Sequence, residues 1–364
     1  MDKKVFNQAY FGKSFQMIGK SLDNCFDCAY CRANDKIEKE YKFLPTELNP
    51  NFKSIPVAVN LFYGDPMLQI DCTLDYLHRL EQADHSGPVI IITKGDLRRF
   101  PKEERFNLDL HFGLSTFGID SKLDGSSLKI FEQNLEYAKE LGYKYSIEFR
   151  PIIKNINDSK EIIERIINIA KKHNTGIGYC GLQVAPFLKE KLKKMGIEFE
   201  HYKGHPLGMK KYVSDEIHNI FDSYEYTFKK TSCLITWKHN LERDPNAHYY
   251  RPHEVGCFNC PMKDKCFSFK ENLSGDKLNV DIPFDYEIVE KEKHVCGLFK
   301  LGLCKFPSDD CKNINGKLIK INEKITTTDV RLIKWLTGYT VDADFEEIPY
   351  MSKKWLNDIL PSLK

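Results

Sequence analysis

Short apolar runs alternate with longer amphipathic segments between about residues 12 and 200. Continuous apolar runs are typical of strands buried on both faces, and apolar residues recurring every three or four positions are typical of helices. This alternation predicts βα units and a parallel sheet. The expected strands cover residues 14–18, 57–62, 89–93, 108–115, 145–149 and 176–184.

The segments between these strands carry helix boundary signals. In the helix that begins near residue 128, Ser126 or Ser127 is placed to cap the start and Gly142 to end it. The next helix is expected to begin near Asp158, with Glu161 three residues later in a capping-box pattern. Six βα units of this kind predict an α/β fold, a partial (β/α)6 TIM-like barrel open on one side.

The pattern changes after residue 200, which suggests three parts. We expect the partial barrel over residues 1–225 and a small Cys-rich module over 226–275, where Cys, His, aromatic residues and Pro are concentrated. Residues 276–364 are expected to form a small α/β accessory domain, with a strand at 317–322, a helix at 328–337 and a short helix near Trp355.

Composition limits the class of protein. The 364 residues are 41% hydrophobic and 29% charged, with a net charge of +2, as in a soluble globular protein without a global attraction to nucleic acid or membrane. No apolar run approaches the ~20 residues of a membrane span, and the first residues lack a signal-peptide stretch. We therefore expect a cytoplasmic protein without a membrane partner, whose twelve cysteines are thiols or metal ligands rather than disulfides.

Three cysteines within seven residues form the main candidate for chemistry: Cys25, Cys28 and Cys31. Three thiolates can hold three irons of a 4Fe–4S cluster, and no fourth cysteine follows as in the ferredoxin pattern, so one iron would stay open to a ligand. A zinc site or an ordinary ferredoxin-like cluster is the alternative.

The cysteine loop and several motifs after it resemble the radical S-adenosylmethionine (SAM) superfamily over roughly residues 12–200. The loop follows the first expected strand, Cys28-Ala29-Tyr30-Cys31 matches the usual Cys-x-aromatic-Cys, and Gly64-Asp65-Pro66 closes the second strand. One departure is the spacing, which is Cys-x2-Cys-x2-Cys instead of Cys-x3-Cys-x2-Cys. The motifs around Gly64, Lys94 and Arg150 look like the branch that contains spore photoproduct lyase.

The resemblance implies how SAM and its cluster would be held. Cys25, Cys28 and Cys31 would bind the 4Fe–4S cluster. The SAM-binding residues implied on successive strand ends are Tyr30 near the adenine, Gly64, Asp65 and Pro66 at the amino group, Lys94, Ser115 at the ribose and Arg150 at the carboxylate. Taken alone, Gly64-Asp65-Pro66 is also an ordinary turn, Lys94 a surface lysine, Ser115 a helix cap and Arg150 a salt-bridge residue. The joint order along the strands carries the resemblance.

A second cysteine group has the spacing Cys-x2-Cys-x5-Cys, at Cys257, Cys260 and Cys266. It is similar to the SPASM and twitch auxiliary modules of many radical SAM enzymes, which implies a second, auxiliary 4Fe–4S cluster. Cys233 is the preferred fourth ligand and Cys296 the alternative. A zinc site that includes one of His239, His248 and His253 is the other interpretation. The loosely spaced Cys296, Cys304 and Cys311 are better explained as plain thiols.

The resemblance implies an enzyme that reductively cleaves SAM to a 5′-deoxyadenosyl radical, which removes hydrogen from a substrate. An electron donor such as flavodoxin or ferredoxin would be its partner. The auxiliary module points to a peptide or protein substrate, in a modification or maturation reaction. The alternatives are a nucleic-acid substrate, favoured by the lysine-rich helix near residues 189–194, and a non-catalytic iron–sulfur or zinc protein. A solvated helix face also explains those lysines.

Overall fold

The computed structural model describes about two thirds of the chain. The described residues are 10–11, 16–18, 26, 28–31, 50–59, 64–184, 188–199, 213–241, 281–294, 313–337, 339–346 and 352–356. Within these ranges, no helix has the length and apolar character that crossing a membrane requires.

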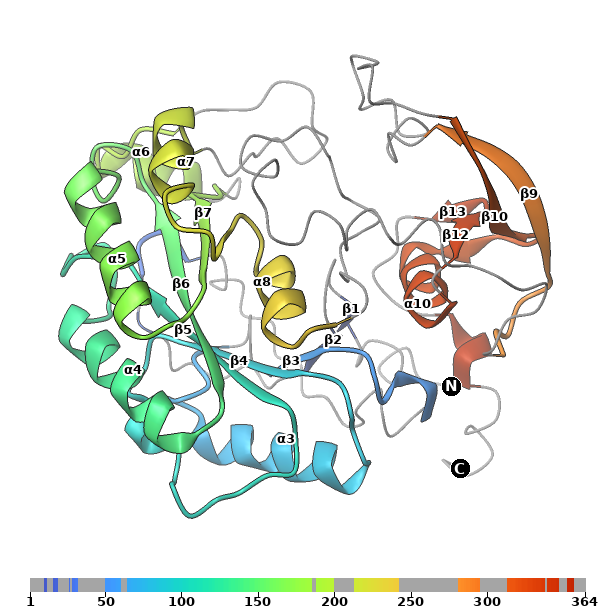
Figure 1. The fold of residues 1–364 in the computed structure, drawn as a ribbon, viewed down its shortest axis with the longest axis horizontal. Coiled ribbons are helices and arrows are strands. Elements are labelled where there is room, and N and C mark those ends of the chain that lie inside the picture. Colours follow the sequence, from blue (N-terminus) through green and yellow to red (C-terminus); the bar gives the residue numbers. More distant parts are fainter. Residues whose placement is uncertain are drawn as a thin grey trace.

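A sheet of eight strands organises the larger part of the molecule (Figure 1). β1 pairs antiparallel with β2, and every later neighbouring pair is parallel. The strands lie in sequence order, as in a TIM-like sheet, whereas doubly wound sheets reverse their order at a switch point. The strands are β1 (Tyr10–Phe11), β2 (Gln16–Ile18), β3 (Val57–Val59), β4 (Val89–Thr93), β5 (Leu110–Thr116), β6 (Lys144–Ile152), β7 (Ile177–Gly181) and β8 (Thr227–Phe228).

All six strands expected from the sequence are present, as β2 to β7. The expectation succeeds because their apolar runs are continuous: all seven residues of β5 and four of the five residues of β4 are buried. β1 and β8 were not expected, because two-residue strands have no periodicity to detect.

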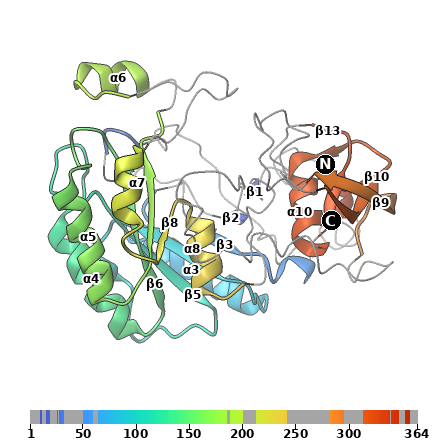
Figure 2. The same ribbon diagram turned by 45° about the horizontal axis from the view of Figure 1, so that its top comes forward.

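Helices cover the outer face of the sheet. The side chains at alternate positions of β3 to β7 pack there in one large apolar core against α3 (Ile70–Gln82), α4 (Leu128–Leu141), α5 (Lys160–Lys172) and α7 (Asp215–Phe221). α8 (Thr231–Lys238) lies on the opposite face, which we call the inner face (Figures 1 and 2). There Ile235 of α8 packs on Ala58 of β3 and Ile90 of β4.

The helix boundaries follow local capping chemistry. The Ser127 hydroxyl accepts a hydrogen bond from the backbone N–H of Lys129, and Gly142 ends α4 with φ of +76°, a conformation that favours glycine. For α5 the expected cap at Asp158 is wrong by one residue. The cap is Ser159, which accepts from the backbone N–H of Ile162, while Asp158 accepts from Asn155 in the preceding turn.

A second, smaller group of elements follows residue 281. β9 (Tyr286–His294), β10 (Asn313–Ile321) and β12 (Thr340–Asp342) form a three-stranded sheet, and β11 (Ile325–Thr326) pairs with β13 (Phe345–Glu346). The expected strand at 317–322 is the second half of β10, and the expected helices are α10 (Thr327–Thr337) and the 3-10 turn η6 (Lys353–Leu356).

This C-terminal unit has its own apolar core, which also takes in two residues from before β3. Phe52, in the 3-10 turn η1 (Pro50–Phe52), and Ile55 pack with Ile319, Ile333 and Trp355. The Phe52 and Trp355 ring centroids are 5.7 Å apart. The division into three domains stays a prediction, and β8 and α8, which follow the expected boundary at 225, belong to the large sheet and its inner face.

A chain of hydrogen bonds ties the end of α8 to the amino ends of β5 and β6. His239 Nδ1 lies 2.6 Å from Asp109 Oδ2, and His239 Nε2 lies 3.1 Å from His111 Nδ1. His111 Nε2 in turn lies 2.7 Å from Ser146 Oγ, and Lys144 Nζ contacts Asp109 Oδ1 at 2.7 Å. Burial lowers the pKa of both histidines, and the nearby Lys144 and Lys238 ammonium groups lower them further. The Asp109 carboxylate opposes this shift at His239 without reversing it.

Because the pKa values of these two histidines are lowered in the folded protein, we expect the protein to lose stability in mild acid. Because their folded-state pKa lies below the unfolded value of 6.5, the unfolded chain binds more protons than the folded chain as pH falls below 6.5. The free energy of unfolding should therefore fall between pH 6.5 and 5, by up to about 1.4 kcal/mol per pH unit for each histidine. Chemical denaturation at several pH values measures this slope.

His239→Gln is the matched variant, because glutamine retains hydrogen-bonding groups but does not titrate. It should reduce the slope, while the slope due to His85, whose pKa burial lowers to about 4, persists. Asp109 does not contribute in this window, because hydrogen bonds from His239 and Lys144 outweigh its burial and lower its pKa below 3.8. An unchanged slope in His239→Gln would contradict the prediction.

Asp329 holds together the C-terminal unit. Its Oδ2 accepts from the backbone N–H of Thr326 at 2.8 Å, and the Thr326 hydroxyl accepts from the backbone N–H of Asp329, as in a capping box at the start of α10. Its Oδ1 accepts from the backbone N–H of Ser352 at 2.8 Å and from the indole N–H of Trp355 at 2.9 Å.

We expect Asp329→Ala to destabilise this unit by about 3 kcal/mol, because it leaves buried donors without an acceptor. Near-ultraviolet circular dichroism and tryptophan fluorescence during denaturation report on the three tryptophans of the chain, one of which is Trp355. The exposed Asp344→Asn in the same unit is the control and should change stability by less than about 0.5 kcal/mol. Equal stability of the two variants would contradict the role of Asp329.

Candidate functional site

The candidate site lies at the carboxyl edge of the parallel sheet, where the Asp65 carboxylate joins the ends of β3 and β4. Asp65 is 7% exposed. Its Oδ1 accepts from Thr93 Oγ1 at 2.5 Å and from the Met67 backbone N–H at 2.9 Å, and its Oδ2 accepts from the backbone N–H of Lys94 at 2.8 Å. Burial raises the pKa of Asp65, and these hydrogen bonds oppose that rise. The carboxylate therefore fixes the backbone from which Lys94 projects.

The neighbouring residues complete this turn. Gly64 has φ of +124°, a conformation that side chains other than glycine rarely adopt. Pro66 is buried, and its carbonyl accepts a hydrogen bond from Thr73 in α3 at 2.9 Å. The Gly-Asp-Pro turn thus anchors the start of α3 to the end of β3.

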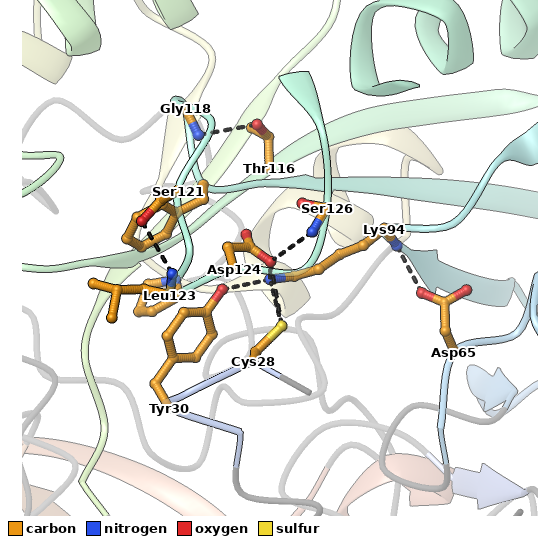
Figure 3. A network of polar contacts seen from close by, with 12 residues as sticks. Cys28, Tyr30, Asp65, Lys94, Thr116, Gly118, Ser121, Leu123, Asp124 and Ser126 are labelled. Atoms are coloured by element: carbon orange, nitrogen blue, oxygen red, sulfur yellow. Dashed lines mark hydrogen bonds and ion pairs between the residues drawn. The ribbon is translucent and has the colours of Figure 1, made fainter. Parts of the chain in front are cut away.

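The Lys94 side chain reaches the cysteine loop (Figure 3). Its Nζ donates to Asp124 Oδ1 at 2.8 Å and to Tyr30 Oη at 2.5 Å, and lies 3.7 Å from Cys28 Sγ. The Lys94 side chain is 16% exposed and the Asp124 side chain is fully buried. Lys94 is therefore an ion-pair partner at the centre of the site rather than a surface lysine.

The cysteine loop is a tight turn fixed to the segment between β5 and α4. Within it the Cys31 N–H donates to the Cys28 carbonyl at 3.0 Å, and the Ala29 N–H donates to the Leu123 carbonyl at 3.0 Å. A side chain at Gly125 would overlap the Phe26 carbonyl, so glycine is required for this approach. The Tyr30 ring stacks on Phe117, with centroids 5.7 Å apart.

An apolar shell surrounds the loop. Cys28 and Tyr30 are buried in a small core to which the ends of β5, β6 and β7 and the following segments contribute, among them α6 (Lys189–Lys194). The main members are Phe117, Ile153, Leu182, Val184, Leu188, Leu192 and Ile197. This shell shields the polar contacts among Lys94, Asp124 and Cys28 from water, which strengthens them.

Opposing effects act on the Cys28 thiol. Burial raises its pKa, the Lys94 ammonium lowers it, the Asp124 carboxylate raises it, and a hydrogen bond from the Gly125 backbone lowers it. In the metal-free protein the thiol is therefore protonated near neutral pH and donates to Asp124 Oδ1 at 3.2 Å. Burial, with Cys28 and Asp124 nearby, raises the pKa of Tyr30 far above its usual range, so its hydroxyl stays neutral.

Ser115 and Arg150 lie near the carboxyl ends of β5 and β6. Ser115 is directly opposite Glu148 in the strand register and is 7% exposed. Arg150 forms an ion pair with Glu148, with Arg150 Nη2 3.0 Å from Glu148 Oε2. The structure thus brings Tyr30, Asp65 and Lys94 together with Cys28, and places Ser115 and Arg150 on the neighbouring strands.

The structure describes only some of the remaining residues that the sequence predicts to bind metal. Cys25, Cys257, Cys260, Cys266 and Cys296 lie outside the described residues, and their metal-binding roles stay predictions. Cys31 is partly exposed at the end of the turn. Cys233 lies on α8 beside Phe228, Leu234 and Trp237. In the part of the chain that the structure describes, no three or more His, Cys, Asp or Glu side chains gather to hold a metal.

Two functional candidates were missed from the sequence: Asp124, which pairs with Lys94, and Glu148, which pairs with Arg150. Asp124 follows a short turn in which the Ser121 hydroxyl accepts from the Leu123 N–H, and nothing in that polar segment marks it as buried. For Glu148 a signal exists: a charged residue stands within the apolar strand 145–149, and buried charges require a partner.

The residues present fit a cluster bound at this loop. Cys28 and Cys31 lie on one short turn, closed by the hydrogen bond from the Cys31 N–H to the Cys28 carbonyl. The Lys94 ammonium would offset the negative charge of thiolate ligands. Asp124 Oδ2 is buried without a hydrogen-bond partner among the described residues, which leaves an acceptor available beside the loop.

No protein-family model and no curated protein matches the chain. Solved structures similar to it include a radical SAM methyltransferase from Sphaerobacter thermophilus, at 13% identity and a TM-score of 0.38, over 58% of this chain and 64% of that one. A cysteine-to-alanine mutant of spore photoproduct lyase is similar at 10% identity and a TM-score of 0.40, over 57% of this chain and 79% of that one. This chain therefore spans less than two thirds of the methyltransferase. With both TM-scores below 0.5, neither likeness assigns it a family or a function.

The charges around Cys28 predict opposite effects of two substitutions on its reactivity. Lys94→Met removes the cation that lowers the Cys28 pKa and should slow alkylation of Cys28 roughly threefold or more. Asp124→Asn removes the anion that raises it and should speed alkylation by a similar factor. Mass spectrometry of iodoacetamide-treated, metal-free protein at pH 7.5 measures both rates, with Cys72 on α3 as the internal reference.

The exposed Lys102, which pairs with Glu140 away from the loop, supplies the control variant Lys102→Met, which should leave the Cys28 rate unchanged. Faster alkylation in Lys94→Met would mean that the loop opens when the ion pair is lost, and would contradict the electrostatic account.

Proposed function

We propose that this chain is a radical SAM enzyme that binds a 4Fe–4S cluster through Cys25, Cys28 and Cys31. The observation that carries the proposal is the meeting of Cys28 and Tyr30 with Lys94 and Asp65 at the carboxyl edge of a parallel sheet whose strands run in sequence order. Ligands of parallel α/β sheets bind at this edge. We also propose that the sheet and its helices form a partial TIM-like barrel.

The residues have distinct roles in the proposed reaction. The chemistry that the cluster supplies when bound is the one-electron reductive cleavage of SAM. Asp65 fixes the turn from which Lys94 projects, and Lys94 supplies positive charge beside the cysteine loop. Tyr30, held by Lys94 and Phe117, forms an apolar wall, and the shell around the loop excludes water from the site. Ser115 and Arg150 would contact the ribose and the carboxylate of SAM.

The proposal also includes a peptide or protein substrate, an electron donor such as flavodoxin or ferredoxin, and a cytoplasmic location. It includes an auxiliary 4Fe–4S cluster bound by Cys233, Cys257, Cys260 and Cys266. Nucleic acid is the second candidate substrate, because Lys191, Lys193 and Lys194 of α6 are exposed beside the shell of the cysteine loop. Binding to nucleic acid that weakens steeply with salt would favour this second candidate, since phosphate contacts release counterions.

Anaerobic turnover tests the proposed reaction. After reconstitution with iron and sulfide, the protein should convert SAM to 5′-deoxyadenosine when dithionite is added, as detected by mass spectrometry. Cys28→Ala should abolish the product because one of three cluster ligands is lost. Cys72→Ala, which removes a thiol on α3 away from the site, is the matched control and should retain the product.

A reducible cluster without 5′-deoxyadenosine would overturn the proposal and favour an electron carrier. A protein that takes up zinc but forms no cluster would favour a structural metal site. Product at the wild-type rate in Cys28→Ala would show that the cluster ligands are assigned wrongly.

A further inference from the structure

Glu148 is a carboxylate in the middle of a buried strand. Its side chain is 1% exposed, although β6 around it is apolar on the outer face, where Ile147 and Phe149 enter the large core. Burial of a carboxylate costs several kcal/mol unless hydrogen bonds and an opposite charge compensate it. A charge at such a position therefore indicates a role that an apolar residue could not fill.

Glycines on both neighbouring strands leave the space that Glu148 occupies. A Cβ at Gly178 on β7 would lie 2.8 Å from Glu148 Oε2, and a Cβ at Gly113 on β5 would lie 3.3 Å from Glu148 Cγ. Both distances are shorter than ordinary contacts between a side chain and its neighbours. The Glu148 side chain on β6 is therefore closely packed between Gly113 on β5 and Gly178 on β7, which limits the positions that its carboxylate can take.

The Glu148 carboxylate contacts both Thr231 and Arg150. Its Oε2 accepts a hydrogen bond from Thr231 Oγ1 in the first turn of α8 at 3.2 Å and forms an ion pair with Arg150, whose Nη2 is 3.0 Å away. Arg150 is on the same strand two residues later, where the register with β7 shifts between Phe149 and Ile152. Such an irregularity re-aims a side chain near a strand end.

Arg150 has one ion pair in the described part of the chain, and this is with Glu148. Its side chain is 25% exposed, so part of the guanidinium still faces outward. A guanidinium has five N–H donors, and the contact with Glu148 occupies one nitrogen, which leaves donors for a second carboxylate. Without Glu148, the partly buried cation would lose its counter-charge and turn toward water.

We propose that Glu148 is a positioning residue that holds Arg150 ready to bind the carboxylate of an amino-acid-bearing ligand at the carboxyl edge of the sheet. This inference rests on the proposed function, in which that ligand is SAM. Glu148 does not itself touch the ligand. Through the hydrogen bond from Thr231 to Glu148, the helix α8 helps to hold the Glu148 carboxylate in place.

The experiment compares two ligands that differ only in the carboxylate: SAM and decarboxylated SAM. Equilibrium binding of each to reconstituted, unreduced protein gives a preference ratio that depends on the Arg150 contact. In Glu148→Ala this ratio should fall about tenfold, the effect of one misplaced charge-assisted hydrogen bond. The affinity for decarboxylated SAM should stay within about twofold of wild type.

Two further variants separate positioning from stability. Ser146→Ala removes another inner-face hydrogen bond of β6, to His111, and should leave the ratio unchanged. Glu148→Gln has nearly the same size and keeps an acceptor oxygen, so it should fold even where Glu148→Ala does not. Its ratio should fall about threefold, because the charge is lost and the acceptor is kept.

The outcomes distinguish this inference from the proposed function. A wild-type protein that prefers SAM, together with Glu148 variants that keep or increase this preference, overturns the positioning role and leaves the proposed function standing. A wild-type protein that binds both ligands equally overturns the role of Arg150 and this inference with it. A wild-type protein that binds neither ligand overturns the proposed function as well.

Discussion

The hydrogen bonds of the buried Asp65 carboxylate are the interaction on which the candidate site depends. One side chain at the end of β3 holds the backbone at the end of β4, and this fixes the base of the Lys94 side chain. Lys94 then meets Asp124 and Cys28, which belong to two other segments of the chain. Four segments distant in sequence are therefore positioned by a short series of buried polar contacts, of which those beside Cys28 are protected from water by the apolar shell.

The strands and the helix ends could be predicted because their causes are local. The apolar runs of β4 and β5 are continuous in the sequence, and Ser127 and Gly142 act on backbone groups within a few residues of themselves. α8 was not predicted, because its sequence from Thr231 to Lys238 lacks a clear polar face. It lies on the inner face of the sheet with Ser232 and Thr236 buried beside Leu234 and Ile235, so its buried side does not stand out as apolar in the sequence.

The site could be predicted only in part, for the same reason. The order of Cys28, Asp65, Lys94 and Arg150 on successive strand ends can be seen in the sequence, since parallel strands bring these ends to one edge. The sequence does not reveal which charges pair. Lys94 and Asp124 are 30 residues apart, and Lys94 and Cys28 are 66 residues apart, so their contact depends on the assembled fold.

The glycine beside the Glu148 carboxylate restricts which residues the neighbouring strand can carry. An alanine Cβ at position 178 would lie 2.8 Å from Glu148 Oε2, so a larger residue there requires the carboxylate to move. At position 113 the nearest obstacle is Ile92, with its Cγ1 2.9 Å from an added Cβ, and Glu148 Cγ follows at 3.3 Å. Positions 148 and 178 should therefore vary together among related chains, as one inherited unit shared by two strands.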